Sequence, residues 1–164
     1  MAETADRSNA ARRARAPIIL ACIVLLAAAA RLLFCLEIVG MHAPLRGDEI
    51  DYHAFATSLA TGEGFATPDG RPSAARPPLW PLVLAGAYRV AGSRPETGRV
   101  VAVALGILVV PLVYAAARRA FPERRGVAAV AAFFAAVNPT LIFMSGYLLA
   151  ENLAIVVLLL FVAL

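Results

Sequence analysis

A short acidic segment holds the first residues of this sequence that could do chemistry. Asp48, Glu49 and Asp51 stand together in the run Gly47-Asp48-Glu49-Ile50-Asp51. A carboxylate can act as a general base toward a hydroxyl group that comes within hydrogen-bond reach. The same residues are also typical of a helix start, with Asp48 as N-cap and Asp51 three positions on. From the residues alone, both catalysis and helix capping stay open.

A second candidate is Glu151, which follows the uncharged run 126–150 and precedes the mostly apolar run 152–164. A carboxylate in such a place costs free energy unless it faces a cavity or a partner, so a functional role is the default hypothesis. The alternative is an ordinary acid at the water-facing end of a helix.

Other polar residues each fit two roles. His53 lies four positions after Glu49, a helical spacing that suits a metal pair or a simple surface pair. Arg76 stands before two consecutive prolines, and Arg31 lies inside the first apolar segment. Each guanidinium fits either snorkelling at a membrane interface or phosphate binding.

Composition indicates which environment must hold these residues. Apolar residues make up 61% of the chain and the mean hydropathy is +0.77, whereas soluble domains are roughly 45–50% apolar. The apolar residues come in long blocks, which favours a membrane protein. The net charge of +4 comes from arginine, but these arginines do not alternate with aromatic residues on a polar surface, so nucleic acid is not expected as a partner.

The order of apolar and polar blocks predicts the organisation of the chain. We expect a disordered cytoplasmic tail at 1–16, a first transmembrane helix at 17–39, an extracytoplasmic loop with interfacial helices at 40–97, and further transmembrane helices at 98–164. A secretory signal peptide is the alternative for the first apolar segment. The fold class is thus an all-α polytopic membrane protein with about four transmembrane helices.

Two short helices are expected in the loop. Apolar residues at positions 52, 55, 56, 59 and 60 mark one face of a helix that ends near Gly62. The segment 77–92 has too few apolar residues for a crossing, which needs roughly 20, so it is expected to be re-entrant or interfacial.

The second half contains the remaining membrane segments. Residues 98–117 form a clear crossing, an arginine-rich loop occupies 118–125, and 126–150 reads as one crossing kinked at Asn138-Pro139. The last segment, from 152, has no polar flank before the sequence ends. We therefore expect a chain truncated at its C-terminus.

Arginine placement predicts the topology. The tail and the loop 118–125 carry the arginine clusters, and such clusters favour the cytoplasmic side. The expected protein is a multi-pass protein of the cell membrane with a cytoplasmic N-terminus. Asp48, Glu49 and Glu151 would then share the extracytoplasmic side.

Several motifs occur in a familiar order: Arg31-Leu32, Gly47-Asp48-Glu49 with Tyr52 and Ala56, Gly62-Glu63-Gly64-Phe65, Arg76-Pro77-Pro78-Leu79, Arg99, the stretch 114–119, and Asn138-Pro139 followed by Leu149-Ala150-Glu151. In this order and spacing, the chain resembles the C-type membrane glycosyltransferases of the protein O-mannosyltransferase and lipid A aminoarabinose-transferase kind. The resemblance covers residues 17–164.

The resemblance implies a function and roles for the acids. Such enzymes transfer a sugar, with inversion, from a polyprenyl-phosphate donor to an extracytoplasmic acceptor. Asp48 would be the general base, Glu49 would support the position of the acceptor or of a metal, and Glu151 would line the same cavity.

The resemblance also implies the residues that bind the substrates. Arg76 would balance the charge of the lipid phosphate, and Tyr52 and His53 would contact substrate on the same helix. Some relatives carry an acid where this chain has Ala75, so a divalent cation is an open question and no metal ligand is assigned.

A second function stays open beside the enzyme. Relatives of this kind are several times longer and complete the lipid-sugar pocket with later helices, so the 164-residue chain is not expected to catalyse alone. The rival hypothesis is a non-catalytic fragment or pseudoenzyme whose helices pack against a partner in the membrane. A transporter is a more distant alternative, since intramembrane carboxylates also mark ion paths.

Overall fold

The computed structural model describes residues 2–67 and 69–163, and over these ranges the chain is helical, with an isolated β-bridge between Ala66 and Pro72 and no strand. The elements in order are α1 (Ala2–Leu33), the π-helix η1 (Phe34–Val39), α2 (Asp48–Thr61), α3 (Leu79–Ala91), α4 (Pro95–Ala120), α5 (Arg125–Val137), α6 (Pro139–Ser145) and α7 (Glu151–Ala163). The expected all-α architecture is confirmed.

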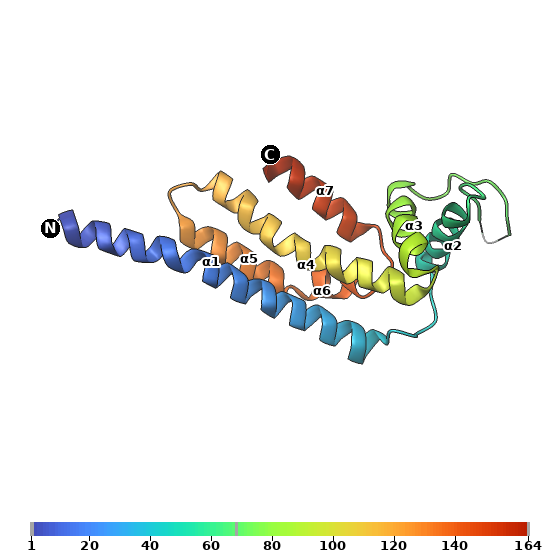
Figure 1. Cartoon of the computed structure of the whole chain (residues 1–164), viewed down its shortest axis with the longest axis horizontal. Coiled ribbons are helices and arrows are strands. Elements are labelled where there is room, and N and C mark those ends of the chain that lie inside the picture. The colour runs from blue at the N-terminus through green and yellow to red at the C-terminus, as the bar shows by residue number, and fades with distance from the viewer. Residues whose placement is uncertain (1, 68, 164) are drawn as a thin grey trace.

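The long helices lie side by side along one axis (Figure 1). Helix α4 is central and packs against α1, α5 and α7. Helices α2 and α3 pack on each other at one end of this bundle, between the end of α1 and the start of α4. The short helices of the first loop therefore cover one end of the membrane segments.

Length and composition identify the segments that could cross a membrane. Residues 16–39 and 95–120 are each long and apolar enough, and α5 with α6 forms a third candidate if the bent pair is one span. The described part of α7 is apolar but shorter, as is α3. Where about four transmembrane helices were expected, the described residues thus contain two candidate spans, or three if the bent pair is one span, and a shorter apolar helix α7. These apolar helices confirm an all-α membrane protein.

The N-terminal segment differs from expectation. Helix α1 begins at Ala2 and passes through Pro17, so the backbone of residues 2–16, expected to be disordered, continues the first membrane helix. Alanine and arginine are among the best helix formers, which favours extension of the helix into a polar segment. The polarity of a segment therefore does not by itself oppose helix formation.

A proline creates the break between α5 and α6. Pro139 has no N–H to donate to the carbonyl of Ala135, four residues earlier. The fully buried guanidinium of Arg31 supplies the missing donors, with Nη2 3.2 Å from Ala135 O and Nη1 3.1 Å from Ala136 O. The two helices meet at 55°. Arg31, for which the sequence left snorkelling and phosphate binding open, therefore caps the C-terminus of α5.

Close packing at this break depends on Gly106 in α4. A Cβ at position 106 would lie 2.5 Å from Ser145 Cβ and 3.1 Å from Arg31 Nε. Helices that cross in a membrane approach closely where small residues face each other. Gly106 thus permits α4 to contact both the cap and α6.

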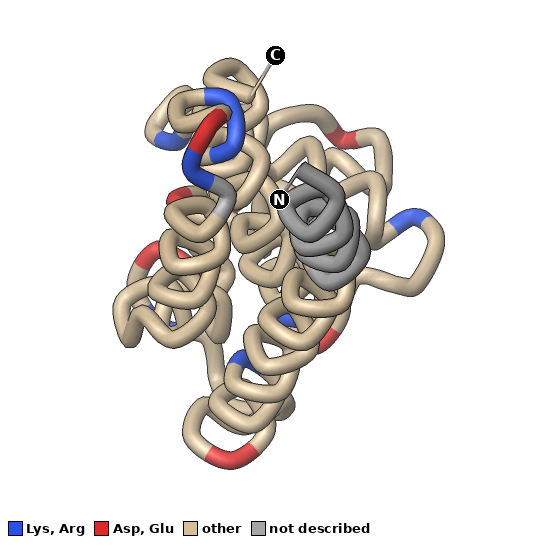
Figure 2. Tube along the Cα trace, turned by 90° about the vertical axis from the view of Figure 1, so that its left-hand side faces the viewer, with Lys and Arg blue, Asp and Glu red and all other residues tan. Residues whose placement is uncertain are grey.

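Two distant contacts define the two ends of the bundle. At one end, Arg119 Nη1 donates to the carbonyl of Ala163 at 3.0 Å, so the α4–α5 connection lies beside the end of α7. Figure 2 looks onto this end and shows basic segments gathered at that connection. At the other end, the backbone N–H of Leu148 donates to Glu49. Loop one and the start of α7 therefore share the end opposite the arginine-rich connection.

The buried Arg99 of α4 fixes the segment that leads into α2. Its Nη1 donates to Met41 O at 2.7 Å and its Nη2 to Ala43 O at 2.9 Å. A guanidinium without exposure needs such acceptors, because an unpaired buried donor is costly. These bonds hold the chain between the first span and α2 against the start of α4.

Candidate active site

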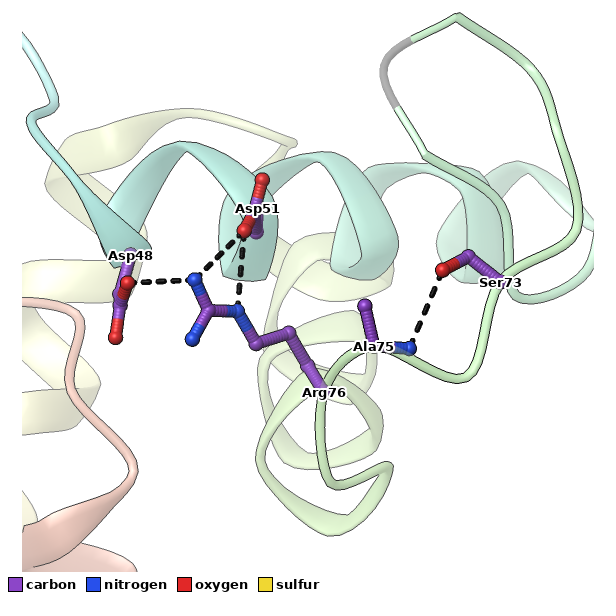
Figure 3. Close-up of polar contacts among 5 residues, drawn as sticks. All are labelled: Asp48, Asp51, Ser73, Ala75 and Arg76. Carbon is purple, nitrogen blue, oxygen red and sulfur yellow. Dashed lines mark hydrogen bonds and ion pairs between the residues drawn. The ribbon is translucent and has the colours of Figure 1, made fainter.

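Arg76 joins two carboxylates of α2 (Figure 3). Its Nη2 lies 2.5 Å from Asp48 Oδ1 and 2.8 Å from Asp51 Oδ2, and its Nε lies 3.0 Å from the same Asp51 oxygen. Asp48 and Asp51 are three residues apart, so they share one face of the helix. All three side chains are partly exposed, and this acidic pair with its guanidinium forms the centre of the candidate site.

Helix capping does not account for Asp48. Helix α2 begins at Asp48 itself, its N-cap is Gly47 with φ 54°, and no side chain caps the helix. A positive φ suits glycine and is strained in other residues. The turn thus aims the Asp48 carboxylate at Arg76 while its negative charge still favours the helix N-terminus.

The chain before α3 places Arg76 opposite α2. Phe65 stacks on Phe55 of α2 with ring centroids 4.2 Å apart, and Ser73 Oγ accepts a hydrogen bond from the N–H of Ala75 at 3.2 Å. The α-helical region is disfavoured for a residue before proline, and Arg76, which precedes Pro77, lies at a bend in the chain. The backbone therefore passes beside the acidic face of α2 before α3 begins.

An open hollow of about 400 Å³ lies along this segment. Its lining comes from Phe65 and from residues 73–78, including Arg76. The guanidinium thus has the aspartates of α2 on one side, and its own segment borders a space that a ligand group could enter.

Tyr52 lies beneath the guanidinium. The Arg76 Cζ atom is 5.6 Å from the Tyr52 ring centroid, and the ring is buried. Burial raises the pKa of the Tyr52 phenol. The positive charge of Arg76 lowers this pKa, and the negative charges of Glu151, Asp48 and Asp51 raise it further. The phenol therefore stays protonated and able to donate a hydrogen bond.

Glu151 shares this end of the molecule. It is the first residue of α7 and is exposed, and its charge is close enough to raise the pKa of Tyr52. The structure thus brings Glu151 near the site electrostatically, from an element about a hundred residues farther along the chain.

Glu49 differs from its neighbours because it is only 2% exposed. Its Oε2 accepts the N–H of Arg46 and its Oε1 the N–H of Leu148, both at 3.1 Å. Both carboxylate oxygens are therefore engaged by backbone donors, one of them from the α6–α7 connection.

His53 faces α3. Its Nδ1 lies 2.8 Å from the Tyr88 hydroxyl oxygen, and the two rings meet edge to face. Burial lowers the pKa of His53, and the negative charge of Glu96 acts in the opposite direction. Burial raises the pKa of the Tyr88 phenol. His53 is therefore neutral near pH 7 and held by Tyr88.

Glu49 and His53 point to different partners although their spacing suits a pair. Glu49 binds backbone N–H groups and His53 contacts Tyr88. Within the described residues, no three His, Cys, Asp or Glu side chains gather closely enough to hold a metal ion.

Two contacts of this region were not predicted. Asp51 belongs to the acidic segment for which catalysis and capping were both open, but it was assigned no role in the site, and it holds Arg76 by two bonds; its spacing of three from Asp48 was the available signal. Trp80 lies in the segment that was expected to be re-entrant or interfacial; it is 1% exposed and its Nε1 donates to Leu148 O at 3.2 Å. No sequence pattern indicates that second contact.

Comparison with known proteins gives one family. The model of the dolichyl-phosphate-mannose-protein mannosyltransferase family matches residues 75–164, which is more than half of the chain. The match includes Arg76 and Glu151, whereas Asp48 and Glu49 precede it. No curated protein and no solved structure matches significantly.

Proposed function

Because the chain belongs to the dolichyl-phosphate-mannose-protein mannosyltransferase family, we propose that it acts in sugar transfer from a polyprenyl-phosphate donor to an acceptor hydroxyl. The observation that carries this proposal is the contact between Asp48 and Arg76, a candidate base beside a candidate phosphate ligand. The site lies at the end of the bundle opposite the arginine-rich connection.

The arginine distribution supports an orientation for this site. Clusters of arginine favour the cytoplasmic side of a membrane, and the α4–α5 connection holds Arg118, Arg119, Arg124 and Arg125. With that connection and the N-terminus in the cytoplasm, α2, α3 and Glu151 face the extracytoplasmic side of the cell membrane, where the donor sugar and acceptor would meet.

Asp48 is the proposed general base. Its carboxylate takes the proton of the acceptor hydroxyl while the hydroxyl oxygen attacks the anomeric carbon on the face opposite the phosphate. The new glycosidic bond forms as the bond between anomeric carbon and phosphate oxygen breaks, so the configuration inverts. The side chain of Asp48 is 52% exposed, which leaves it accessible to an acceptor.

Arg76 is the proposed partner of the leaving lipid phosphate. The anion that departs gains charge in the transition state, and a fixed guanidinium stabilises it. Figure 3 shows the third guanidinium nitrogen of Arg76, Nη1, without a contact to the residues drawn, while Nε and Nη2 are held by the aspartates. A phosphate would approach the side that this nitrogen presents.

The remaining expected residues have supporting roles in this proposal. The Tyr52 phenol lies under Arg76 and can donate a hydrogen bond to a sugar oxygen. Glu151 faces the same end of the bundle and would bound the acceptor side. His53, held by Tyr88, would shape the surface of α2 next to the site.

The proposal is tested by sugar transfer in membranes. The protein, with any C-terminal continuation of its reading frame, is expressed and supplied with radiolabelled polyprenyl-phosphate sugars. We expect labelled product on the extracytoplasmic side that is absent from membranes without the protein. Equal labelling in both membranes would reject the enzyme and favour a non-catalytic membrane protein.

A further inference from the structure

The peptide group of Leu148 is held on both sides by side chains from the first loop. Its N–H donates to Glu49 Oε1 at 3.1 Å, and its carbonyl accepts a hydrogen bond from Trp80 Nε1 at 3.2 Å. All three residues are buried, with exposed fractions of 2%, 1% and 0% for Glu49, Trp80 and Leu148. We call this arrangement the Leu148 clasp.

Burial makes the clasp specific. A buried carboxylate is costly unless donors satisfy it, and a hydrogen bond to a charged group is stronger than one between neutral groups. Glu49 has two such donors, the N–H groups of Leu148 and Arg46. Without the Leu148 N–H, the buried carboxylate of Glu49 would keep only one donor, which costs free energy. This cost holds the α6–α7 connection against Glu49.

The clasp connects the segments that carry the proposed chemistry. Glu49 follows Asp48 directly, Trp80 lies four residues after Arg76, and Leu148 lies three residues before Glu151. Three sequence-distant segments therefore meet at one peptide group. Their relative positions determine how Asp48, Arg76 and Glu151 face a shared ligand.

We propose that Glu49 is a positioning residue, and that with Trp80 it holds the Leu148 peptide so that the start of α7 stays registered against the Asp48–Arg76 pair. This inference rests on the proposed sugar transfer for its functional consequence, although the clasp itself can be observed without any activity. It differs from the role that the family resemblance implies, in which Glu49 supports an acceptor or a metal directly.

Three substitutions separate the acceptor role of Glu49 from its size. Glu49→Gln keeps the shape and one oxygen, which can still accept the more buried Leu148 N–H, but its amide cannot accept the N–H of Arg46. Glu49→Ala removes both acceptors. Glu63→Gln is the matched control, because it makes the same chemical change at an exposed position beyond the end of α2.

The single tryptophan of the sequence reports on the clasp. In the purified protein, we expect the Trp80 emission of Glu49→Ala to shift to longer wavelength as the α6–α7 connection separates and water reaches the indole. Glu49→Gln should shift less, and Glu63→Gln should match the parent. Parent-like emission in Glu49→Ala would overturn the clasp.

Amide hydrogen exchange gives an independent measurement. The segment 146–150 should exchange faster in Glu49→Ala than in the parent, while the α4–α5 connection exchanges equally in both. Trp80→Phe, which keeps an aromatic ring but removes the donor, should also speed exchange in this segment. Unchanged exchange of this segment in both variants would overturn the clasp.

Sugar transfer then separates the possible outcomes. We expect Glu49→Ala to lower kcat about a hundredfold, the effect that a misplacement of roughly 1 Å can have, with little change in KM for the donor. If Glu49→Ala loses transfer while its clasp remains parent-like, Glu49 takes part directly and the positioning role is overturned. If Glu49→Ala keeps full transfer although the clasp is released, the positioning role is overturned as well. If the parent itself transfers no sugar, the proposed function fails and the positioning role fails with it, while emission and exchange still decide whether the clasp exists.

Discussion

Asp51 and Arg76, twenty-five positions apart, are joined by two hydrogen bonds to one carboxylate oxygen, at 3.0 Å from Nε and 2.8 Å from Nη2. With Asp48 on the same Nη2, one positive charge faces two negative charges. An anionic ligand of Arg76 must therefore approach against a local excess of negative charge. This relationship makes Asp51 as relevant to donor binding as Arg76 itself.

Removal of the Asp51 charge should ease donor binding. Asp51→Asn keeps an oxygen that accepts from Arg76 but removes one negative charge near the phosphate. We expect KM for the donor to fall about two- to fivefold, the size of effect typical of a partly exposed charge, and the difference to shrink at high salt. Steady-state transfer kinetics measure this, with exposed Asp69→Asn as control. A raised KM would mean that Asp51 mainly orders Arg76.

Replacement of Arg76 should act in the opposite direction. Arg76→Gln removes the guanidinium that the lipid phosphate would contact, so we expect KM for the donor to rise roughly tenfold or more, as expected when a charge-assisted contact is lost. Arg71→Gln, at an exposed arginine five residues earlier, is the matched control. Equal KM values in the two variants would exclude Arg76 from donor binding.

Arg31 should matter for stability through its cap on α5. Arg31→Met keeps a long apolar side chain but leaves the carbonyls of Ala135 and Ala136 without these donors. We expect a loss of roughly 1–3 kcal/mol, the cost of an unsatisfied buried polar group, seen as a lower Tm in a thermal-shift assay in detergent. Arg71→Met should leave Tm unchanged. A stable Arg31→Met protein would show that the cap contributes little.

Particular residues show what the sequence could and could not predict. Apolar blocks of sufficient length indicated the membrane segments. The arginine clusters indicated that Asp48 and Glu151 would lie at the same end of these segments. Both signals come from short stretches of the sequence. The proline at 139 predicted a kink. These signals depend on composition and on the covalent restrictions of single residues.

Partners across long separations were not predictable in this way. Arg31 contacts Ala135 across 104 positions and Glu49 contacts Leu148 across 99. In both cases the partner is a backbone group, which every residue carries, so no side-chain pattern marks it. Asp51 was easier to foresee, because a helix places residues three apart on one face, but its pairing with Arg76 depends on how the loop before α3 returns to α2.

The stability of the folded protein should depend on pH through His53. Because burial lowers the pKa of His53 below its ordinary 6.5, the unfolded chain binds more protons than the folded one below about pH 6.5. Stability should therefore be complete above that pH and fall as the pH decreases toward the folded pKa. Tm of the parent should drop between about pH 7 and pH 5 by more than Tm of His53→Asn, which keeps an acceptor for Tyr88. Parallel pH profiles would contradict this.

The most direct test of the account is sugar transfer by Asp48→Asn. Asparagine preserves the size of the side chain and an oxygen that can accept from Arg76, but it cannot take a proton from the acceptor, so the variant separates base chemistry from the contact with Arg76. We expect kcat to fall by a factor of about 10²–10⁴, typical of a lost general base, with unchanged expression and, as for Asp51→Asn, a KM for the donor that is lowered about two- to fivefold, while Asp69→Asn retains parent activity. Full transfer by Asp48→Asn would contradict the assignment of Asp48 as the base and with it the proposed active site.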